Sequence, residues 1–238
     1  MRTRIFFATT ALILSAYANA AVVNPPTVPI IGVTGTTGMV QTIAAPDANI
    51  YPDAVLFGSF ESNTTAFVWQ EQTVAVGDLG VSRLVNGGDL YTTPGTLQTL
   101  GAGTYSSYFL HMESDVATLG GAQGLTYTGS ITFSQEIEAL IYNKQENCDT
   151  HSIFGSPETN YPTAPNCGTN QNFDFARADN WIEISEDRKT LTFSQYTPHD
   201  MDQVRILTSA VPIPAAVWLF GSGLGLLGWM RRRGAAKA

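Results

Sequence analysis

The chain of 238 residues carries 20 acidic and 12 basic side chains, and its formal net charge is −8 at pH 7. All the acidic residues lie within the segment 47–205, where 6 basic residues accompany 20 acidic ones, so this segment has a net charge of −14. A body this acidic repels phosphate groups, which excludes nucleic acid as a partner and disfavours anionic lipid surfaces.

The first residues, 1–20, predict a cleavable signal peptide. Two arginines near the start are followed by an uncharged apolar run over residues 5–16. This run is shorter than the roughly 20 residues that span a bilayer, which argues against the alternative of a membrane anchor. Ala18 and Ala20 place small residues where signal peptidase reads them, so cleavage is predicted between Ala20 and Ala21.

Residues 21–50 are expected to form an irregular lead-in. Prolines block regular pairing near its start, and glycines are spread among threonines without a helical period. A short strand within 29–33 is the regular element that this stretch suggests.

The body, residues 51–209, is expected to consist of short strands separated by turns. Apolar, aromatic and threonine-rich segments predict strands at 54–60, 65–76, 79–85, 104–112, 125–133, 136–142, 181–185, 189–193 and 203–208. The short Ser134-Gln135 connection predicts a hairpin, and Glu186-Asp187-Arg188 predicts a second, charged hairpin turn. The body shows no apolar period of a long amphipathic helix.

The last three predicted strands alternate apolar and polar residues with a period of two. This alternation is typical of sheets with one solvated face. Many short strands with frequent turns and no internal repeat predict an all-β fold, a single jelly-roll-like β-sandwich. The long connection 143–180 is expected to be a loop that crosses one end of it.

Cys148 and Cys167 both fall in the part predicted to be exported, where an even number of cysteines favours a disulfide. The bond would close a loop of about twenty residues and stabilise the fold by about 3 kcal/mol. The alternative is a metal site, because His151 follows Cys148 at a spacing of three. A structural zinc site needs four ligands in short paired spacings, and this set is incomplete, so we favour the disulfide.

The C-terminal tail has three consecutive parts. They are the proline motif Val211, Pro212, Ile213, Pro214 and Ala215, the uncharged span 215–230, and the basic stop Arg231, Arg232 and Arg233. The span predicts a transmembrane helix of roughly 25 Å at about 1.5 Å per residue. Three arginines beside it place the C-terminus in the cytoplasm by the positive-inside rule.

This tail, residues 211–233, resembles the PEP-CTERM sorting signal, in which a proline motif, a short glycine-containing span and an arginine cluster stand in the same order. Ile213 replaces the central acidic residue of the family, which gives a VPxPA-like variant. The resemblance implies a Gram-negative host that makes exopolysaccharide or biofilm. It also implies processing near the proline motif by exosortase, a membrane-embedded cysteine transpeptidase.

Two segments of the body place histidine beside carboxylates. His111, Glu113 and Asp115 alternate along one strand face and could hold a cation, but a solvated strand face explains them as well and is favoured. Segment 199–202 has a histidine that could act as a base. No nucleophile motif accompanies it, so a turn between two strands is favoured.

Two further groups could form surface sites. Four carboxylates could approach one another near the end of the long connection, without matching a calcium motif: Asp174, Asp179, Glu186 and Asp187. Six aromatic residues could form a carbohydrate platform, although aromatics in strands are more often core: Trp69, Trp181, Tyr91, Tyr105, Tyr108 and Tyr127.

The sequence therefore assigns no catalytic residue, no cofactor and no metal site. We expect an exported cell-envelope or extracellular-matrix protein without enzymatic activity, associated with extracellular polysaccharide. Signal peptidase and exosortase would process it, first as an inner-membrane precursor and then as a surface or extracellular protein. The alternative is a secreted polysaccharide-binding or polysaccharide-hydrolysing enzyme, and hydrolysis would need two carboxylates roughly 5–9.5 Å apart across a cleft.

Overall fold

The computed structural model describes residues 33–34, 39–50, 58, 60–115, 124–162, 167, 173–197 and 201–210. The predicted signal peptide and the predicted sorting tail lie outside these residues, as do His199 and Asp200. Within the described ranges, no helix is both long enough and apolar enough to cross a membrane.

The described residues form thirteen strands and one helix, which confirms the predicted all-β character. A five-stranded sheet has the order β1 (Val33–Thr34), β9 (Leu125–Thr132), β12 (Thr190–Thr197), β11 (Trp181–Ile184) and β6 (Leu90–Tyr91). A six-stranded sheet has the order β2 (Met39–Thr42), β3 (Thr65–Val76), β8 (Gly103–Glu113), β13 (Met201–Ser209), β10 (Ile137–Ile141) and β5 (Arg83–Leu84). A small sheet pairs β4 (Leu79–Val81) with β7 (Gln98–Leu100). Within these sheets β2 and β3 are parallel, and the other neighbouring strands are antiparallel.

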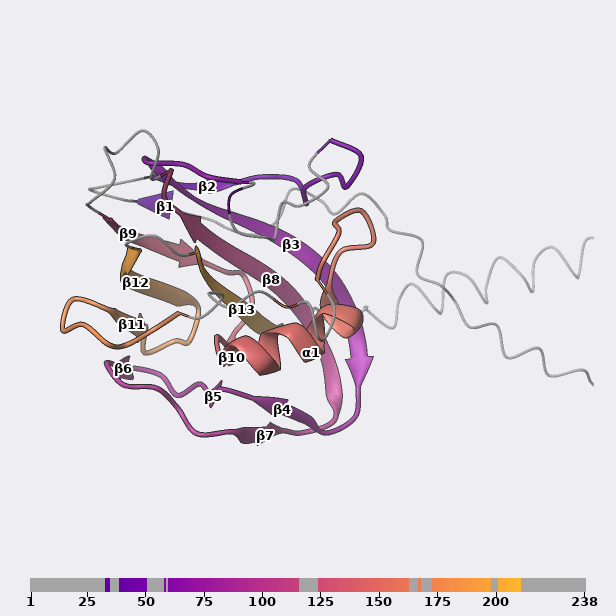
Figure 1. The fold of residues 1–238 in the computed structure, drawn as a ribbon. Coiled ribbons are helices and arrows are strands. Elements are labelled where there is room, and N and C mark those ends of the chain that lie inside the picture. Colours follow the sequence, from indigo (N-terminus) through magenta and orange to yellow (C-terminus); the bar gives the residue numbers. More distant parts are fainter. Residues whose placement is uncertain are drawn as a thin grey trace, which may run out of the picture.

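The two larger sheets share one hydrophobic core (Figure 1). The five-stranded sheet contributes Ile131, Ile182, Leu191 and Phe193, and the six-stranded sheet contributes Val68, Leu110, Val204 and Ile206. Full burial of each such side chain stabilises the fold by about 1.5–3 kcal/mol. Gly129 allows a close approach here, because a Cβ atom at this position would lie 2.2 Å from Val40 Cγ2.

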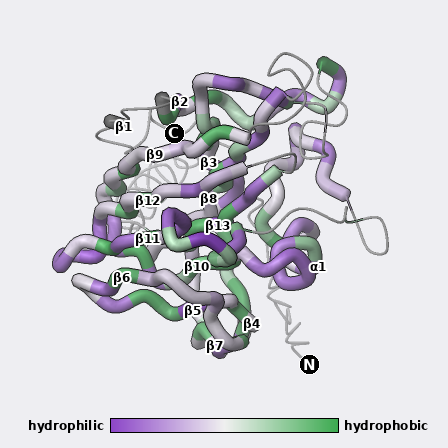
Figure 2. The backbone as a smooth tube through the Cα atoms, turned by 60° about the vertical axis from the view of Figure 1, so that its left-hand side comes forward, coloured by the Kyte–Doolittle hydropathy of each residue, from purple (hydrophilic) through white to green (hydrophobic). Residues whose placement is uncertain are grey.

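The opposite face of the six-stranded sheet is covered by α1 (Lys144–Phe154), which runs beside β10 and β13 and is mostly hydrophilic (Figures 1 and 2). Apolar side chains of α1 and of the sheet form a second cluster that includes Phe154, Ala139, Ile141 and Leu207. Trp69 and Phe109 form a third cluster, against which Tyr161 packs. The centre of this sheet is therefore buried on both faces.

This covering overturns the solvated face that the alternation in 203–208 predicts. On the face of β13 opposite the shared core, Gln203, Arg205 and Leu207 are all 0% exposed. In β11 the alternation does separate a core face from a solvated face, as predicted, because Ile182 and Ile184 are buried and Glu183 is exposed. The same periodicity thus describes a strand that faces solvent and a strand that faces a helix.

The predicted hairpin across Ser134-Gln135 is wrong. β9 belongs to the five-stranded sheet and β10 to the six-stranded sheet, so this connection carries the chain from one sheet to the other. The predicted hairpin around Glu186-Asp187-Arg188 is confirmed, because β11 and β12 pair as antiparallel neighbours.

Helix α1 lies inside the connection 143–180, where the sequence predicts only a loop. Asn143 caps the helix, since its side chain accepts a hydrogen bond from the main-chain nitrogen of Gln145 at 3.0 Å. The residues that α1 buries are mostly polar: Asn147, Cys148, Thr150, His151 and Phe154. An apolar period therefore does not mark this helix.

The other predicted strands agree unevenly with the structure. The prediction 65–76 coincides with β3, whereas 79–85 is divided into β4 and β5 around Ser82. The strands β2, β6 and β7 were not predicted, because two to four residues are too few to show a period. Of the predicted strand 54–60, the described residues Gly58 and Phe60 lie in a turn and a bend.

Cys148 of α1 is bonded to Cys167, with Cα atoms 5.9 Å apart and a sequence separation of 19. This confirms the predicted disulfide. It also removes the alternative metal site, because both sulfur atoms are used in the bond. The loop that ends at Cys167 is thereby attached to the helix.

We predict that replacing both cysteines with alanine lowers the free energy of unfolding by about 3 kcal/mol, because the opened loop gains entropy in the unfolded chain. Urea unfolding of the double variant and of the wild-type protein measures the difference. Alkylation of the denatured, unreduced wild-type protein is the control, and labelling of both cysteines would contradict the bond.

Candidate functional site

A buried ion pair joins β13 to β3. Arg205 donates from Nε to Glu71 Oε2 at 2.7 Å and from Nη2 to Glu71 Oε1 at 2.8 Å. Both side chains are fully buried. Glu71 lies where the register of β3 on β8 shifts between Gln70 and Thr73, and an irregularity of this kind re-aims a side chain.

Helix α1 supplies the other partners of the guanidinium group. Arg205 Nη1 contacts the main-chain oxygen of Asn147 at 2.9 Å, its Oδ1 at 3.0 Å and Thr150 Oγ1 at 2.6 Å. Arg205 Nη2 also lies 2.9 Å from His151 Nδ1. All three guanidinium nitrogens are therefore hydrogen-bonded, as a buried cation requires.

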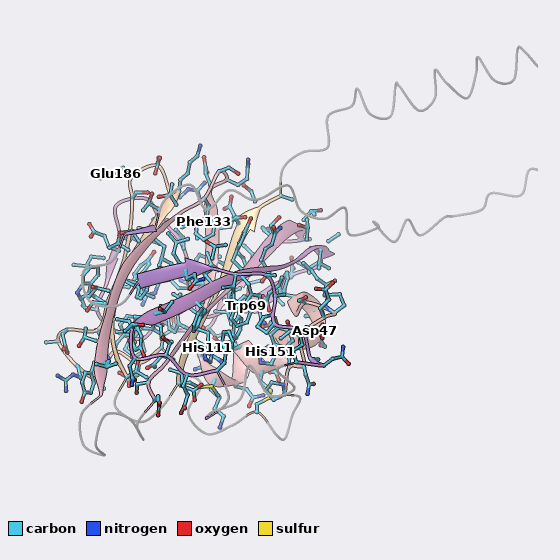
Figure 3. The ribbon with its side chains drawn as sticks, turned by 90° about the horizontal axis from the view of Figure 1, so that it is seen from above. Asp47, Trp69, His111, Phe133, His151 and Glu186 are labelled. Atoms are coloured by element: carbon cyan, nitrogen blue, oxygen red, sulfur yellow. A yellow bond between two sulfur atoms is a disulfide. The ribbon has the colours of Figure 1, made fainter. Side chains whose placement is uncertain are left out.

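His151 takes part in this cluster as a neutral acceptor. Burial, together with the positive charge of Arg205, lowers the pKa of His151 to about 2. Nδ1 accepts from Arg205, so the ring proton is assigned to Nε2. The rings of Tyr161 and Phe109 lie 4.9 Å and 5.9 Å from the His151 ring. Trp69, labelled with His151 in Figure 3, donates from Nε1 to the Tyr161 hydroxyl at 3.0 Å. The cluster is enclosed, and we assign it a structural role: it fixes α1 on the sheet.

We predict that Arg205→Met lowers the free energy of unfolding by about 3–5 kcal/mol, because it leaves the Glu71 carboxylate buried without its cation. The double variant Glu71→Met/Arg205→Met removes both charges and should be more stable than Arg205→Met alone. Denaturant unfolding of the wild type, both single variants and the double variant tests this as a cycle. A double variant no more stable than either single variant would contradict it.

We also predict a pH effect from His151. Its pKa is about 2 in the folded protein against 6.5 as the ordinary value, so below pH 6.5 the unfolded chain binds a proton that the folded chain does not. The contribution to stability is fully present above pH 6.5 and falls by up to about 1.4 kcal/mol per pH unit toward pH 2. His151→Asn, whose amide oxygen replaces Nδ1 as acceptor, should decline less between pH 7 and pH 5. Parallel stability curves for the two proteins would refute this.

A pocket of about 330 Å³ lies where the first turn of α1 meets two loops. One loop contains residues 94–95, and the other contains residues 173–176, ahead of β11. Its lining residues include three aromatic residues, a serine and two acidic residues: Tyr142, Phe173, Phe175, Ser82, Glu146 and Asp174. Its volume is at the lower end for small-molecule sites, which measure about 300–1,000 Å³.

The three rings form a connected aromatic wall. The centroids of Tyr142 and Phe175 are 5.3 Å apart with planes at 72°, and those of Phe173 and Phe175 are 5.1 Å apart at 52°. The Tyr142 hydroxyl accepts hydrogen bonds from the main-chain nitrogen of Gly95 at 2.7 Å and from Arg83 Nε at 3.4 Å. These contacts use the oxygen as an acceptor, so the hydroxyl hydrogen remains to be donated.

The carboxylate of Glu146 is held by a short network. Ser82 Oγ donates to Glu146 Oε2, and it accepts from the main-chain nitrogens of Tyr142 and Asn143, both at 3.0 Å. This contact uses one of the two carboxylate oxygens. Glu146 Oε1 has no hydrogen-bond partner among the residues that the structure describes.

Asp174 is oriented in the same manner. Its Oδ1 accepts from the main-chain nitrogen of Ala176 at 3.0 Å and from Asn180 Nδ2 at 2.8 Å. Its Oδ2 is without a hydrogen-bond partner in the described part of the chain. The pocket thus combines two pre-oriented carboxylates with an aromatic wall.

The structure brings His111 and Glu113 together, but in the interior. His111 Nε2 and Glu113 Oε2 are 3.4 Å apart and both side chains are buried, so the favoured solvated face is wrong. The main chain of Asp115 is bonded to the side chain of Asn63 at 2.8 Å and 3.2 Å. Across the described ranges, no group of three or more His, Cys, Asp or Glu side chains could hold a metal ion.

The other predicted groups do not assemble. Asp174 and Asp179 precede β11 whereas Glu186 and Asp187 follow it, so the strand separates the four carboxylates into two pairs. Of the segment 199–202, residues 201–202 form the buried start of β13, and the histidine lies outside the described residues.

The favoured interpretation of the six aromatic residues, that they belong to the core, is confirmed for the four that are buried: Trp69, Tyr91, Tyr108 and Tyr127. The rings that line the pocket were not among the six. Phe173-Asp174-Phe175, two aromatics around a carboxylate within a polar connection, is the local signal that could have indicated them.

Comparison of the chain with protein-family models, with curated proteins and with solved structures found no match.

Proposed function

We propose that the chain is an exported, non-enzymatic protein of the cell envelope or extracellular matrix of a Gram-negative bacterium, associated with extracellular polysaccharide. The bond between Cys148 and Cys167 is the observation that supports export, because disulfides persist in oxidising compartments. The predicted signal peptide and the tail that resembles PEP-CTERM support it from both ends of the sequence. The acidic body disfavours nucleic acid as a partner.

The proposal includes the finer architecture and the processing. The body is proposed to be a single jelly-roll-like β-sandwich, and two sheets with mostly antiparallel pairing around one core support this. The span 215–230 would hold the precursor in the inner membrane, with Arg231, Arg232 and Arg233 in the cytoplasm, until exosortase acts near Pro214.

One observation favours a second candidate, hydrolysis of the polysaccharide. Glu146 and Asp174 line the same pocket, and glycoside hydrolysis uses two carboxylates on either side of the scissile bond. Release of reducing ends from the polysaccharide, lost in Glu146→Gln, would favour hydrolysis over binding.

We predict that Pro212→Ala/Pro214→Ala blocks release from the inner membrane and leaves folding unchanged. Both prolines lie beyond β13 in the sequence. Proline disfavours helix, so we expect it to favour the extended form in which a peptidase binds main chain. With alanine the membrane helix lengthens into the recognition segment. Mass spectrometry of the inner-membrane fraction should then find a chain that begins at Ala21 and still carries its C-terminal tail.

The control is Ile213→Val, which keeps both prolines and should mature like the wild type. Disulfide formation and protease resistance of the body should be equal in all three proteins. If the proline variant is released at the wild-type rate, the sorting interpretation of the tail is wrong and a plain membrane anchor replaces it.

A further inference from the structure

We propose that the pocket beside α1 binds a positively charged ammonium group, and that an amino sugar of the associated polysaccharide carries this group. The polysaccharide part of this inference rests on the proposed function. The ammonium part rests on the pocket alone.

The side chains of the pocket favour a cation over a neutral or anionic ligand. The faces of aromatic rings attract ammonium groups. Phe175 is the half-buried ring of the wall, and Tyr142 and Phe173, which are buried, pack against it. Glu146 Oε1 and Asp174 Oδ2 add two carboxylate oxygens whose partner oxygens are already held by the protein. A cation bound in this pocket would be attracted by both carboxylates, with little cost for orienting them.

The charges around the pocket agree with this. The helix N-terminus carries roughly half a positive charge, which the full negative charge of Glu146 in the first turn of α1 exceeds. Arg83 contacts the Tyr142 hydroxyl but does not line the pocket. Its guanidinium carbon lies 4.5 Å from the centre of the Tyr91 ring, and its Nη2 donates to the Thr93 carbonyl at 3.1 Å. The net charge of −14 on the body raises the local concentration of cations and repels acidic sugars.

The pocket is lined by aromatic, hydroxyl-bearing and acidic residues together, and this combination fits a charged sugar unit better than a small cation without hydroxyl groups. An amino sugar has an apolar ring face that can stack on the half-buried ring of Phe175, and hydroxyl groups that can both donate and accept. The Tyr142 hydroxyl offers one donor for such a hydroxyl oxygen, and Glu146 and Asp174 offer acceptors. A simple alkylammonium ion would use the rings and carboxylates and leave the Tyr142 donor unused.

The test is calorimetric titration of the chain, expressed in full and purified after export, with glucosamine oligosaccharides and with N-acetylglucosamine oligosaccharides of equal length. We expect measurable binding of the amine form and at least about tenfold weaker binding of the acetylated form, because acetylation removes the charge. Tetramethylammonium should compete with the amine form. Glu146→Gln/Asp174→Asn should weaken amine binding at least about tenfold.

The matched control is Glu158→Gln/Glu183→Gln, which removes two exposed carboxylates that do not line the pocket and should leave binding unchanged. The single variant Glu146→Gln is the second test if the double variant is unstable, and thermal unfolding verifies its fold. Equal affinity for the amine and acetylated sugars, or unchanged affinity of the pocket variants, would overturn the proposal. Binding of tetramethylammonium without the amino sugar would overturn the choice of ligand. Cell fractionation tests export separately, so a cytoplasmic protein would refute the proposed function and leave the titration to decide on the pocket.

Discussion

The buried charge of Arg205 is the constraint on which the rest of this structure depends. Moving a cation out of water costs several kcal/mol, and a full set of partners is needed to offset that cost. Arg205 obtains its carboxylate from Glu71 in β3 and its neutral acceptors from Asn147, Thr150 and His151 in α1. The ion pair joins two strands of the sheet, and the helix completes the hydrogen bonds of the guanidinium group, so that without α1 the Nη1 nitrogen would lose all of its acceptors.

This constraint also positions the pocket. An isolated helix of 11 residues is marginal in water, and α1 buries mostly polar side chains, so its own sequence does not hold it in place. The Arg205 cluster and the bond from Cys148 to Cys167 both hold α1, and they fix the turn that carries Glu146. The Ser82 hydroxyl then connects that carboxylate to the end of β10. The polar interior behind the pocket thus holds in place the helix that carries Glu146.

Local patterns in the sequence predicted the elements whose environment is set by their own residues. The strand 65–76 and the alternation of β11 could be predicted because side chains on a strand alternate between core and solvent. The same logic failed at β13, where the face opposite the core meets α1, and periodicity cannot tell water from a covering helix. The helix itself was missed because its buried stripe is polar. The pocket was missed because its lining comes from four distant segments, and only Phe173-Asp174-Phe175 is a local signal.

The distribution of charge explains why a pocket, and not the surface at large, would select a ligand. Four of the six basic residues of the body are already engaged: Arg83 over Tyr91, Arg177 with Asp179, Arg188 with Glu136 and Glu138, and Arg205 with Glu71. Much of the acidic surface is therefore left without a counter-charge. Salt screens such exposed charges over about 8 Å at physiological ionic strength, so diffuse attraction does not distinguish one cation from another. Carboxylates with an aromatic wall behind them are screened less, because the wall excludes water and ions from one side. Selectivity in this acidic protein is therefore expected where the negative charge meets buried rings, and that place is the pocket at the start of α1.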